Sequence, residues 1–307
     1  MLGYTIRRMA GAVPTLFLVI VVSFFMMRLA PGGPFDKERV APPEIRANLE
    51  RVYHLDEPLW RQFLRYLGDV AQGDFGPSFK YKDFSVTQLI WQGFPVSLQL
   101  GGAAIVLAAV LGIVLGALAA LNQNRPLDVA VMAGAMTGIA IPNFVLAPLL
   151  TLVLGVYLSW LPVGGWGDGG LRQAFLPVVA LALPQVAYVA RLARGSMIEV
   201  LGSNYIRTAR AKGLPEHLTV ARHALKGALL PVVSYLGPAT AAIITGSVVI
   251  EQIFGIPGIG RYFVQGALNR DYTLVMGTVI FYGALIILAN LIVDLVYGLL
   301  DPKVRYD

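Results

Sequence analysis

Residues 96–121 read VSLQLGGAAIVLAAVLGIVLGALAAL and contain no Asp, Glu, Lys or Arg. A helix rises about 1.5 Å per residue and the hydrocarbon core of a bilayer is roughly 30 Å thick, so about 20 apolar residues suffice to cross a membrane. Other stretches of the chain show the same lack of charge at a comparable length. The uncharged stretches are 9–27, 84–124 (which contains residues 96–121), 129–167, 173–190, 227–250 and 272–293. The sequence predicts an all-α membrane protein with six transmembrane helices.

The composition of the 307-residue chain agrees with that prediction. Hydrophobic residues make up 56% and charged residues 14%, against about 25% charged residues in an ordinary soluble domain. This composition argues against a soluble enzyme, a disordered chain or a nucleic-acid-binding module. The chain has no cysteine, which excludes disulfides and thiolate-ligated metal sites.

The third uncharged stretch, 129–167, is nearly long enough for two helices. Pro162 and the glycine-rich run 164–170 interrupt it, and such residues end helices. We therefore expect its helix to end near Tyr157. Pro142 and Pro184 lie inside predicted spans, where proline kinks a helix.

Small residues recur four positions apart in two of the predicted spans. Gly112 precedes Gly116, and Gly134 precedes Gly138. This spacing lets helix backbones approach closely in lipid, and ordinary helix packing is the expected reason for it.

The distribution of basic residues predicts the orientation of the chain, because Lys and Arg are retained on the cytoplasmic side. Arg7 and Arg8 precede the first span, and segment 191–227 carries seven basic residues against two acidic ones. Segment 28–94 is balanced, with nine of each sign. We expect both termini to lie inside the cell.

These patterns divide the chain into three parts. Residues 1–93 hold the first helix and an external segment, 94–295 form a core of five helices with the cytoplasmic loop 191–227, and 296–307 form a cytoplasmic tail. The first apolar stretch is also compatible with a cleaved signal peptide. Its length, and the lack of an A-x-A site after Arg28, favour a retained helix.

The external segment 28–94 is too long for a simple connector. Its sequence predicts two amphipathic helices, at 44–52 and 58–70, each with apolar residues three and four positions apart. The segment forms either a cap that packs on the spans or a docking surface for an external partner, and the sequence leaves both open.

The internal segment 191–227 has the pattern of helices separated by a sharp turn. Residues 194–201, 203–212 and 216–228 are predicted helices, and Gly213-Leu214-Pro215 breaks the last two apart, since glycine ends helices and proline cannot continue them. Such a basic protrusion suits insertion into a groove of another protein. The alternative is a basic loop that binds anionic lipid.

The run Arg207-Thr208-Ala209-Arg210-Ala211-Lys212-Gly213 resembles the cytoplasmic "EAA" loop of ABC importer permeases. Ala209 and Gly213 match that loop, whereas Arg207 and Thr208 replace its usual Glu and Ala. The resemblance extends over essentially the whole chain. It includes residues 26–32, 73–78, 223–226, 230–231, 251–260 and 269–272. Together they are similar to the B-type permease subunits of bacterial oligopeptide importers, in the peptide-transport family.

This resemblance implies a multi-pass protein of the bacterial cytoplasmic membrane with the type I ABC importer permease fold. It implies a homologous second permease, two ATPases that bind ATP and Mg, and an external peptide-binding protein. Oligopeptides are the implied substrate, with dipeptides, nickel or glutathione as alternatives. A self-contained channel or secondary carrier is a further alternative, against which the nearly uncharged spans argue.

The resemblance also implies that the internal loop couples the permease to the ATPases. Ala209 and Gly213 are expected to pack the turn against an ATPase groove, and Arg207, Arg210 and Lys212 to pair with acidic groups there. The predicted coupling residues are Arg207, Thr208, Ala209, Arg210, Lys212, Gly213 and Leu214. The missing Glu at position 207 means that no role of that glutamate is transferred.

The chain carries no sequence signature of catalysis. It has no G-x-x-x-x-G-K-[ST], so ATP chemistry is expected on other chains. Gly165-Trp166-Gly167-Asp168 fits the G-x-G-D pattern of intramembrane aspartyl proteases, but the second carboxylate that such a dyad needs is missing from the spans. We expect no catalytic residue, cofactor or metal in this chain.

Few polar groups lie inside the predicted spans. We consider Asn143, Gln185, Ser234 and Asn290 as candidates for lining the path. Asp294 lies near the inner end of the last span, where an acid either marks an ion path or faces the interface.

Overall fold

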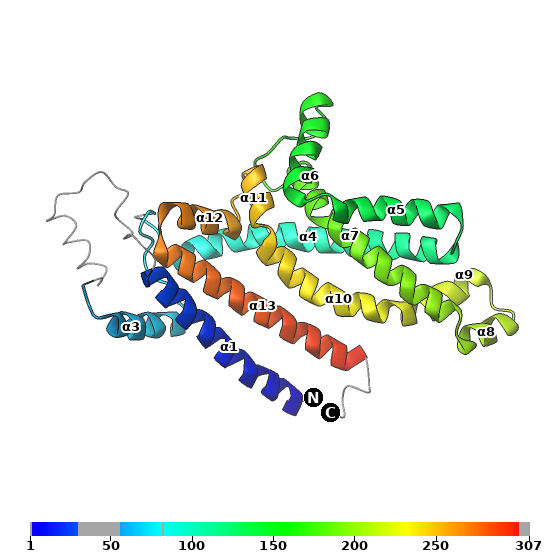
Figure 1. Cartoon of the computed structure of the whole chain (residues 1–307), viewed down its shortest axis with the longest axis horizontal. Helices are drawn as coiled ribbons and strands as arrows, with labels where there is room; N and C mark the ends of the chain where they lie inside the picture. Colours follow the sequence, from blue (N-terminus) through cyan, green and yellow to red (C-terminus); the bar gives the residue numbers. More distant parts are fainter. Residues whose placement is uncertain (1, 30–55, 82, 301–307) are drawn as a thin grey trace. The chain divides into compact units, whose positions relative to one another are not determined.

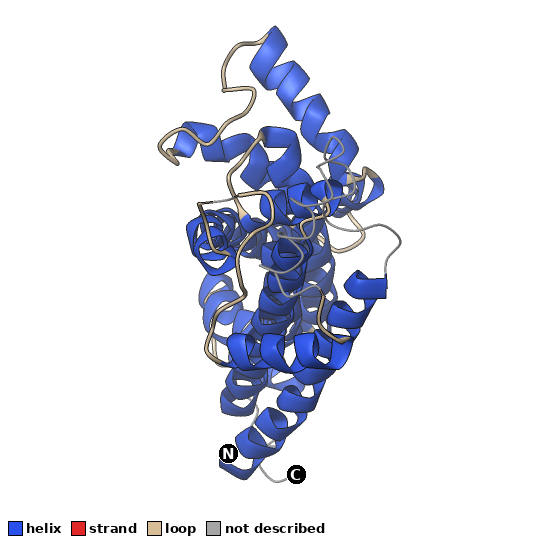
Figure 2. Ribbon diagram, turned by 90° about the vertical axis from the view of Figure 1, so that its left-hand side faces the viewer, coloured by secondary structure: helices blue, strands red, loops and turns tan. Residues whose placement is uncertain are grey.

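A computed structural model describes residues 2–29, 56–81 and 83–300. Those residues form helices joined by loops, without a strand (Figures 1 and 2). The elements are α1 (Leu2–Leu29), α3 (Leu59–Ala71), α4 (Val86–Leu121), α5 (Pro126–Ala140), α6 (Asn143–Leu150), η1 (Thr151–Tyr157), α7 (Leu171–Leu201), α8 (Asn204–Ala211), α9 (Glu216–Leu218), η2 (Thr219–Ala224), α10 (Leu225–Gly246), α11 (Val248–Phe254), α12 (Ile259–Asn269) and α13 (Tyr272–Leu300). The all-α prediction is confirmed.

Among the described residues, five helices are long and apolar enough to cross a membrane. They are Ala10–Leu29, Val86–Leu121, Leu171–Leu201, Glu216–Thr245 and Tyr272–Ile292. The pair Pro126–Ala140 and Asn143–Tyr157 passes the same test together, which gives six spans if the pair is one. Counted in this way, the described helices give the six spans that the sequence predicts.

The third predicted span is not a straight helix. α5 and the α6–η1 segment meet at an angle of 105°. The break falls at Ile141, which is extended (φ −96°, ψ 118°), and Pro142. Proline has no N–H to donate and disfavours the helical conformation in the residue before it. Pro184, by contrast, stays inside the unbroken α7. The segment ends at Tyr157, as predicted.

The chain divides into two compact units, which are described separately. We call Leu2–Val96 with Pro257–Ile287 the outer unit, and Ser97–Ile256 with the chain from Leu288 onward the inner unit. The outer unit holds α1, α3, the start of α4, α12 and most of α13. The inner unit holds the rest of α4, α5 to α11 and the end of α13.

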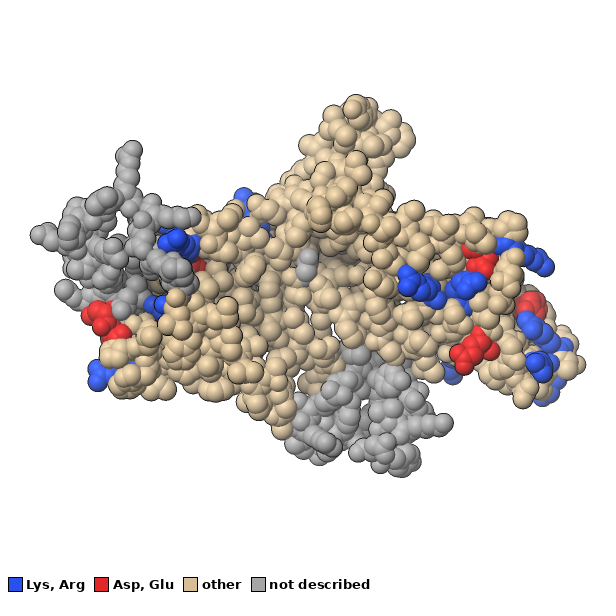
Figure 3. All heavy atoms as spheres, viewed as in Figure 1, with Lys and Arg blue, Asp and Glu red and all other residues tan. Residues whose placement is uncertain are grey.

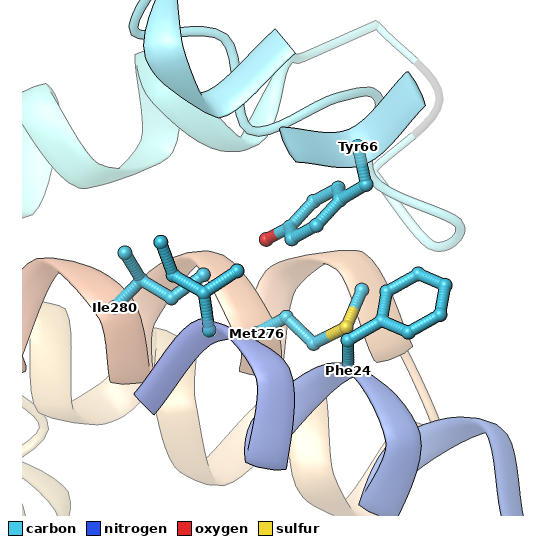
Figure 4. Packing of buried hydrophobic residues seen from close by; sticks show 5 residues of the cluster. Phe24, Tyr66, Met276 and Ile280 are labelled. Carbon is cyan, nitrogen blue, oxygen red and sulfur yellow. The ribbon is translucent and has the colours of Figure 1, made fainter. Parts of the chain in front are cut away.

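The core of the outer unit joins α1, α3 and α13. Phe24, Tyr66, Met276 and Ile280 are buried against one another (Figure 4). Phe63, Leu67 and Val70 of α3 pack against the same cluster. The helix predicted at 58–70 is confirmed, and its stripe packs on the spans as the cap interpretation requires. The helix predicted at 44–52 lies outside the described residues.

A buried carboxylate fixes the loop before α4 to the start of α13. Asp271 is fully buried and accepts hydrogen bonds from the Ser78 hydroxyl, the Lys80 N–H (3.2 Å) and the Leu274 N–H (3.1 Å). A buried carboxylate is costly unless such donors surround it. Two motifs that lie far apart in the sequence, 73–78 and 269–272, thus form one contact.

Glycines allow α4 to approach α7 closely in the inner unit. A Cβ at Gly112 would lie 2.5 Å from Val189 Cβ, and one at Gly116 would lie 2.5 Å from the carbonyl oxygen of Ala190. Gly138 approaches α7 in the same way, whereas a Cβ at Gly134 would meet nothing within 4 Å. Three of the four small residues noted in the sequence therefore serve close packing.

We expect Gly116→Ala to destabilise the protein, because the new methyl group would collide with the α7 backbone. Overpacking of this kind costs about 1–3 kcal/mol. Gly134→Ala is the matched control, since it adds the same methyl group in open space. Thermal unfolding in detergent is the measurement, and an equal unfolding temperature for both variants would contradict the close approach.

Candidate functional site

The predicted coupling loop forms a helical elbow, which we define as residues 202–224. α7 ends at Leu201, α8 runs from Asn204 to Ala211, and α9 begins at Glu216 after Pro215. α9, η2 and α10 then continue as one helical segment, Glu216–Thr245. The predicted helix, break and helix are confirmed by these bounds.

One face of α8 is packed on the inner unit. Ile206 is fully buried and belongs to an apolar cluster with Ala120, Met197, Ala224 and Ala228, which come from α4, α7, η2 and α10. Ala209 is only 7% exposed. Its small side chain is therefore covered by this chain itself, whereas the sequence analysis expected it against a partner's groove. The elbow is attached to the helices by this apolar face.

Gly213 forms the turn of the elbow through its backbone conformation. Its φ is +78°, in the left-handed region, and its N–H donates to the Arg210 carbonyl oxygen at 2.9 Å. Left-handed glycine is a common way to end a helix. A Cβ at this position would meet nothing within 4 Å. Glycine is therefore favoured at this position by its left-handed backbone conformation, because a side chain would meet no other group of this chain.

An ion pair closes the turn. Arg210 donates two hydrogen bonds to Glu216, Nη2 to Oε1 at 2.6 Å and Nε to Oε2 at 3.1 Å. The Glu216 carboxylate raises the pKa of the Arg210 guanidinium further above its ordinary value. Arg210 thus already has an acidic partner in its own chain, which the sequence analysis did not foresee.

The remaining predicted coupling residues face solvent. Arg207, Thr208, Lys212 and Leu214 are exposed along the outer side of the elbow. Figure 3 shows basic side chains, with acidic ones among them, around α8 and α9, while the visible face over α6 has neither acidic nor basic atoms. The elbow therefore offers cations and the exposed side chains of Tyr205 and Leu214 to a neighbouring molecule.

A second ion pair, missed in the sequence, fixes the base of the elbow. Arg194 of α7 binds Asp128 with both Nε (2.6 Å) and Nη2 (2.7 Å), and Asp128 is 3% exposed. Asp128 also accepts the Asn124 N–H at 2.9 Å. This pair joins α7 to the first turn of α5. The sequence indicated only that both residues are charged and lie near span ends.

The four path candidates have different environments. Gln185 accepts a hydrogen bond from the Tyr235 hydroxyl at 2.6 Å, and Ser234 donates to the Leu230 carbonyl oxygen of its own helix at 3.0 Å. Asn143 Oδ1 is buried and bonded to no described residue, whereas Asn290 is exposed. The structure thus places Gln185 in a contact between α7 and α10. The side chain of Asp294 lies outside the described set.

Two family models match the chain. The model described as "Binding-protein-dependent transport system inner membrane component" matches residues 112–306, and its N-terminal counterpart matches residues 1–101. The chain belongs to this family. It is a multi-pass inner-membrane transport component rather than an enzyme.

Full-length relatives agree with the family. The chain is 58% identical over 306 residues to the "Oligopeptide transport system permease protein OppB" of Escherichia coli (strain K12), and the match covers 100% of both chains. The protein of that name from Haemophilus influenzae is 55% identical over 100% of both chains. The "Dipeptide transport system permease protein DppB" of Bacillus subtilis is 46% identical over 99% of this chain and 98% of its own.

A solved structure supports the fold. The chain resembles the structure titled "Crystal structure of an amino acid ABC transporter with histidines" with a TM-score of 0.56 and 18% identity, over 69% of this chain and 94% of that one. The fold expected from the sequence is thereby confirmed. The orientation of the chain in the membrane stays a prediction.

We expect Gly213→Val to loosen the elbow, because a residue with a Cβ pays about 1–2 kcal/mol to adopt a left-handed conformation. Gly213→Asn should be tolerated better, since Asn adopts that region more readily. Hydrogen exchange of the amides in 204–224 is the measurement, and Gly195→Ala, in open space on α7, is the control. Unchanged exchange in Gly213→Val would show that the turn does not depend on glycine.

Proposed function

We propose that this chain is the B-type permease of a bacterial oligopeptide importer. Together with a second, homologous permease it forms the path for oligopeptides across the cytoplasmic membrane. The observation that carries the proposal is the full-length similarity to permeases named for oligopeptide transport, at 58% identity, against 46% for one named for dipeptide transport.

The proposed partners follow from the family. An external binding protein delivers the peptide, and two ATPase chains bind ATP and Mg and supply the energy. The elbow is the proposed contact with the ATPases. Its exposed cations, Arg207 and Lys212, and the apolar side chain of Leu214 form the docking side.

The attachment of the elbow supports this role. Ile206 and Ala209 bury one face of α8, and the Arg194–Asp128 ion pair ties α7 to the first turn of α5. A displacement of the outer side of the elbow is then passed to α4, α7 and α10 at once, because the cluster around Ile206 includes residues of all three helices. Switching of transporters by rigid movement of packed helices is a known type of transition.

The nearly uncharged spans suit a peptide substrate. A peptide backbone presents donors and acceptors but few fixed charges, so a wide path with scattered polar groups serves peptides of different sequence. We propose Asn143, Gln185, Ser234 and Asn290 as groups of that path. Asn143 supports this because its buried oxygen lacks a hydrogen bond to any described residue.

Deletion of this permease should abolish the uptake of oligopeptides, and dipeptides should not enter through this system even before the deletion. Radiolabelled peptides of two to six residues are the probes, in cells that carry only this import system. Loss of dipeptide uptake alone would assign the dipeptide alternative. Uptake of nickel and glutathione, measured in the same cells, tests the other two substrates.

The lack of native cysteine makes a contact test direct, because any introduced cysteine is unique in the chain. We expect Lys212→Cys to crosslink to an ATPase chain with a short thiol–amine reagent, to an extent that depends on ATP. Leu171→Cys, 91% exposed and predicted on the opposite side of the membrane, is the control. A crosslink at Leu171→Cys in place of Lys212→Cys would reject the docking role.

A further inference from the structure

Arg28, at the end of α1, is a cation without a counter-ion among the described residues. Its guanidinium lies 5.4 Å from the centre of the Phe24 ring. Its Nε is buried and hydrogen-bonded to none of the groups that the structure describes. A desolvated cation is costly unless an anion or several acceptors offset the loss of water. The position is therefore built for an acceptor from elsewhere.

A cavity of about 140 Å³ lies beside Arg28, within the outer unit. Its walls include Arg28, Gln62, Arg65, Asp69, Phe75 and Thr273. Since a water molecule takes about 30 Å³ of liquid volume, the cavity holds roughly four waters or one phosphate or carboxylate group. It is too small for a peptide.

The unsatisfied donor of Arg28 is the feature of the cavity that calls for an anion. Arg65 already binds Glu57 at 2.8 Å, and Asp69 is the acidic group of the wall. Arg28 is thus the cation with bonding capacity to spare. The planar guanidinium suits two parallel hydrogen bonds to a phosphate or carboxylate.

The helix that covers the cavity has a second apolar face. Trp60 and Leu64, one turn apart on α3, are 57% and 58% exposed. The Arg61 guanidinium lies 5.1 Å from the centre of the Trp60 ring. Tryptophan with neighbouring arginine is typical of helices in the headgroup region of a bilayer. The opposite face of α3 packs on α1 and α13.

α1 also carries a shallow, open apolar hollow, whose described lining residues do not include Arg28. Val21, Val22, Phe25, Met26 and Leu29 line this space of about 490 Å³. Arg28 is the penultimate residue of the candidate span Ala10–Leu29, so it lies where the hydrocarbon core gives way to the phosphate layer. The open apolar side of α1 would contact the acyl chain of a lipid whose phosphate binds at Arg28.

We propose that the cavity at Arg28 binds the phosphate of a membrane phospholipid, and that α3 lies in the headgroup region with Trp60 and Leu64 toward lipid. Arg28 donates to the phosphate oxygens, and the acyl chain follows the hollow of α1. Free inorganic phosphate shares this chemistry, and the experiment separates the two sources.

The test is the amount of phospholipid that the purified transport complex retains after extensive washing in detergent, counted by native mass spectrometry. We expect Arg28→Gln to lower retention at the site at least fivefold. Arg191→Gln is the matched control, because it removes an exposed arginine that also stacks on an aromatic ring, that of Tyr188 on α7. Equal retention in Arg28→Gln and the wild type would overturn the proposal.

A second variant keeps the test independent of folding defects. Asp69→Asn removes a negative charge from the cavity wall, so it should raise phospholipid retention about twofold or more. Unchanged or lower retention in Asp69→Asn would count against an anion in the cavity.

The source of the phosphate is resolved by competition. Phosphatidylglycerol vesicles should reload the washed wild-type complex but not Arg28→Gln, and inorganic phosphate in excess should not prevent reloading. If inorganic phosphate alone fills the site, seen as an Arg28-dependent ³¹P signal, and excludes the lipid, the occupant is a free ion and the lipid proposal is wrong.

Discussion

Inside a bilayer the lipid is as apolar as the helices, so the hydrophobic effect does not press one span against another. The arrangement of the described helices depends instead on close backbone contact and on buried polar pairs. Gly112 and Gly116 bring α4 against α7 where any side chain would collide. The Arg194–Asp128 pair then fixes α7 to the first turn of α5, the helix that follows α4. Close contact supplies dispersion energy, and the ion pair selects one register.

Three of the described carboxylates, Asp128, Glu251 and Asp271, are buried near places where long helices meet other segments. Asp271 holds the loop before α4 at the start of α13, and Glu251 accepts the hydroxyl hydrogen bonds of Ser97 (2.7 Å) and Ser247 (2.6 Å). With Asp128, these groups join segments far apart in the sequence. Directional hydrogen bonds do here what apolar packing cannot, because they tolerate only one relative placement of the segments.

Local patterns were sufficient to predict much of this chain. The uncharged stretches gave the spans, and the Gly213–Pro215 break gave the elbow, because span length and helix ends are set by neighbouring residues. The amphipathic stripe at 58–70 was predicted for the same reason. Pro142 indicated a kink, but not the bend of 105°, since that angle also depends on how α6 packs against α7 and α11.

Contacts between distant residues could not be predicted in this way. Asp128 and Arg194 are 66 positions apart, and the sequence shows them only as loop charges. The burial of Ala209 depends on how α8 lies on the inner unit, which no local pattern specifies. The resemblance implied that Ala209 packs against an ATPase groove, and within this chain its side chain is largely buried.

The ion pair of the elbow has a consequence for recognition. An exposed pair contributes little to stability, and both Arg210 and Glu216 are half exposed. Its main effect is to neutralise two charges and to hold Glu216 against the turn that Gly213 makes. The positive field of the elbow then comes from Arg207, Lys212 and Arg222, for which the described residues offer no ion pair. An acidic groove that meets the elbow would bind these three side chains without first breaking an internal pair.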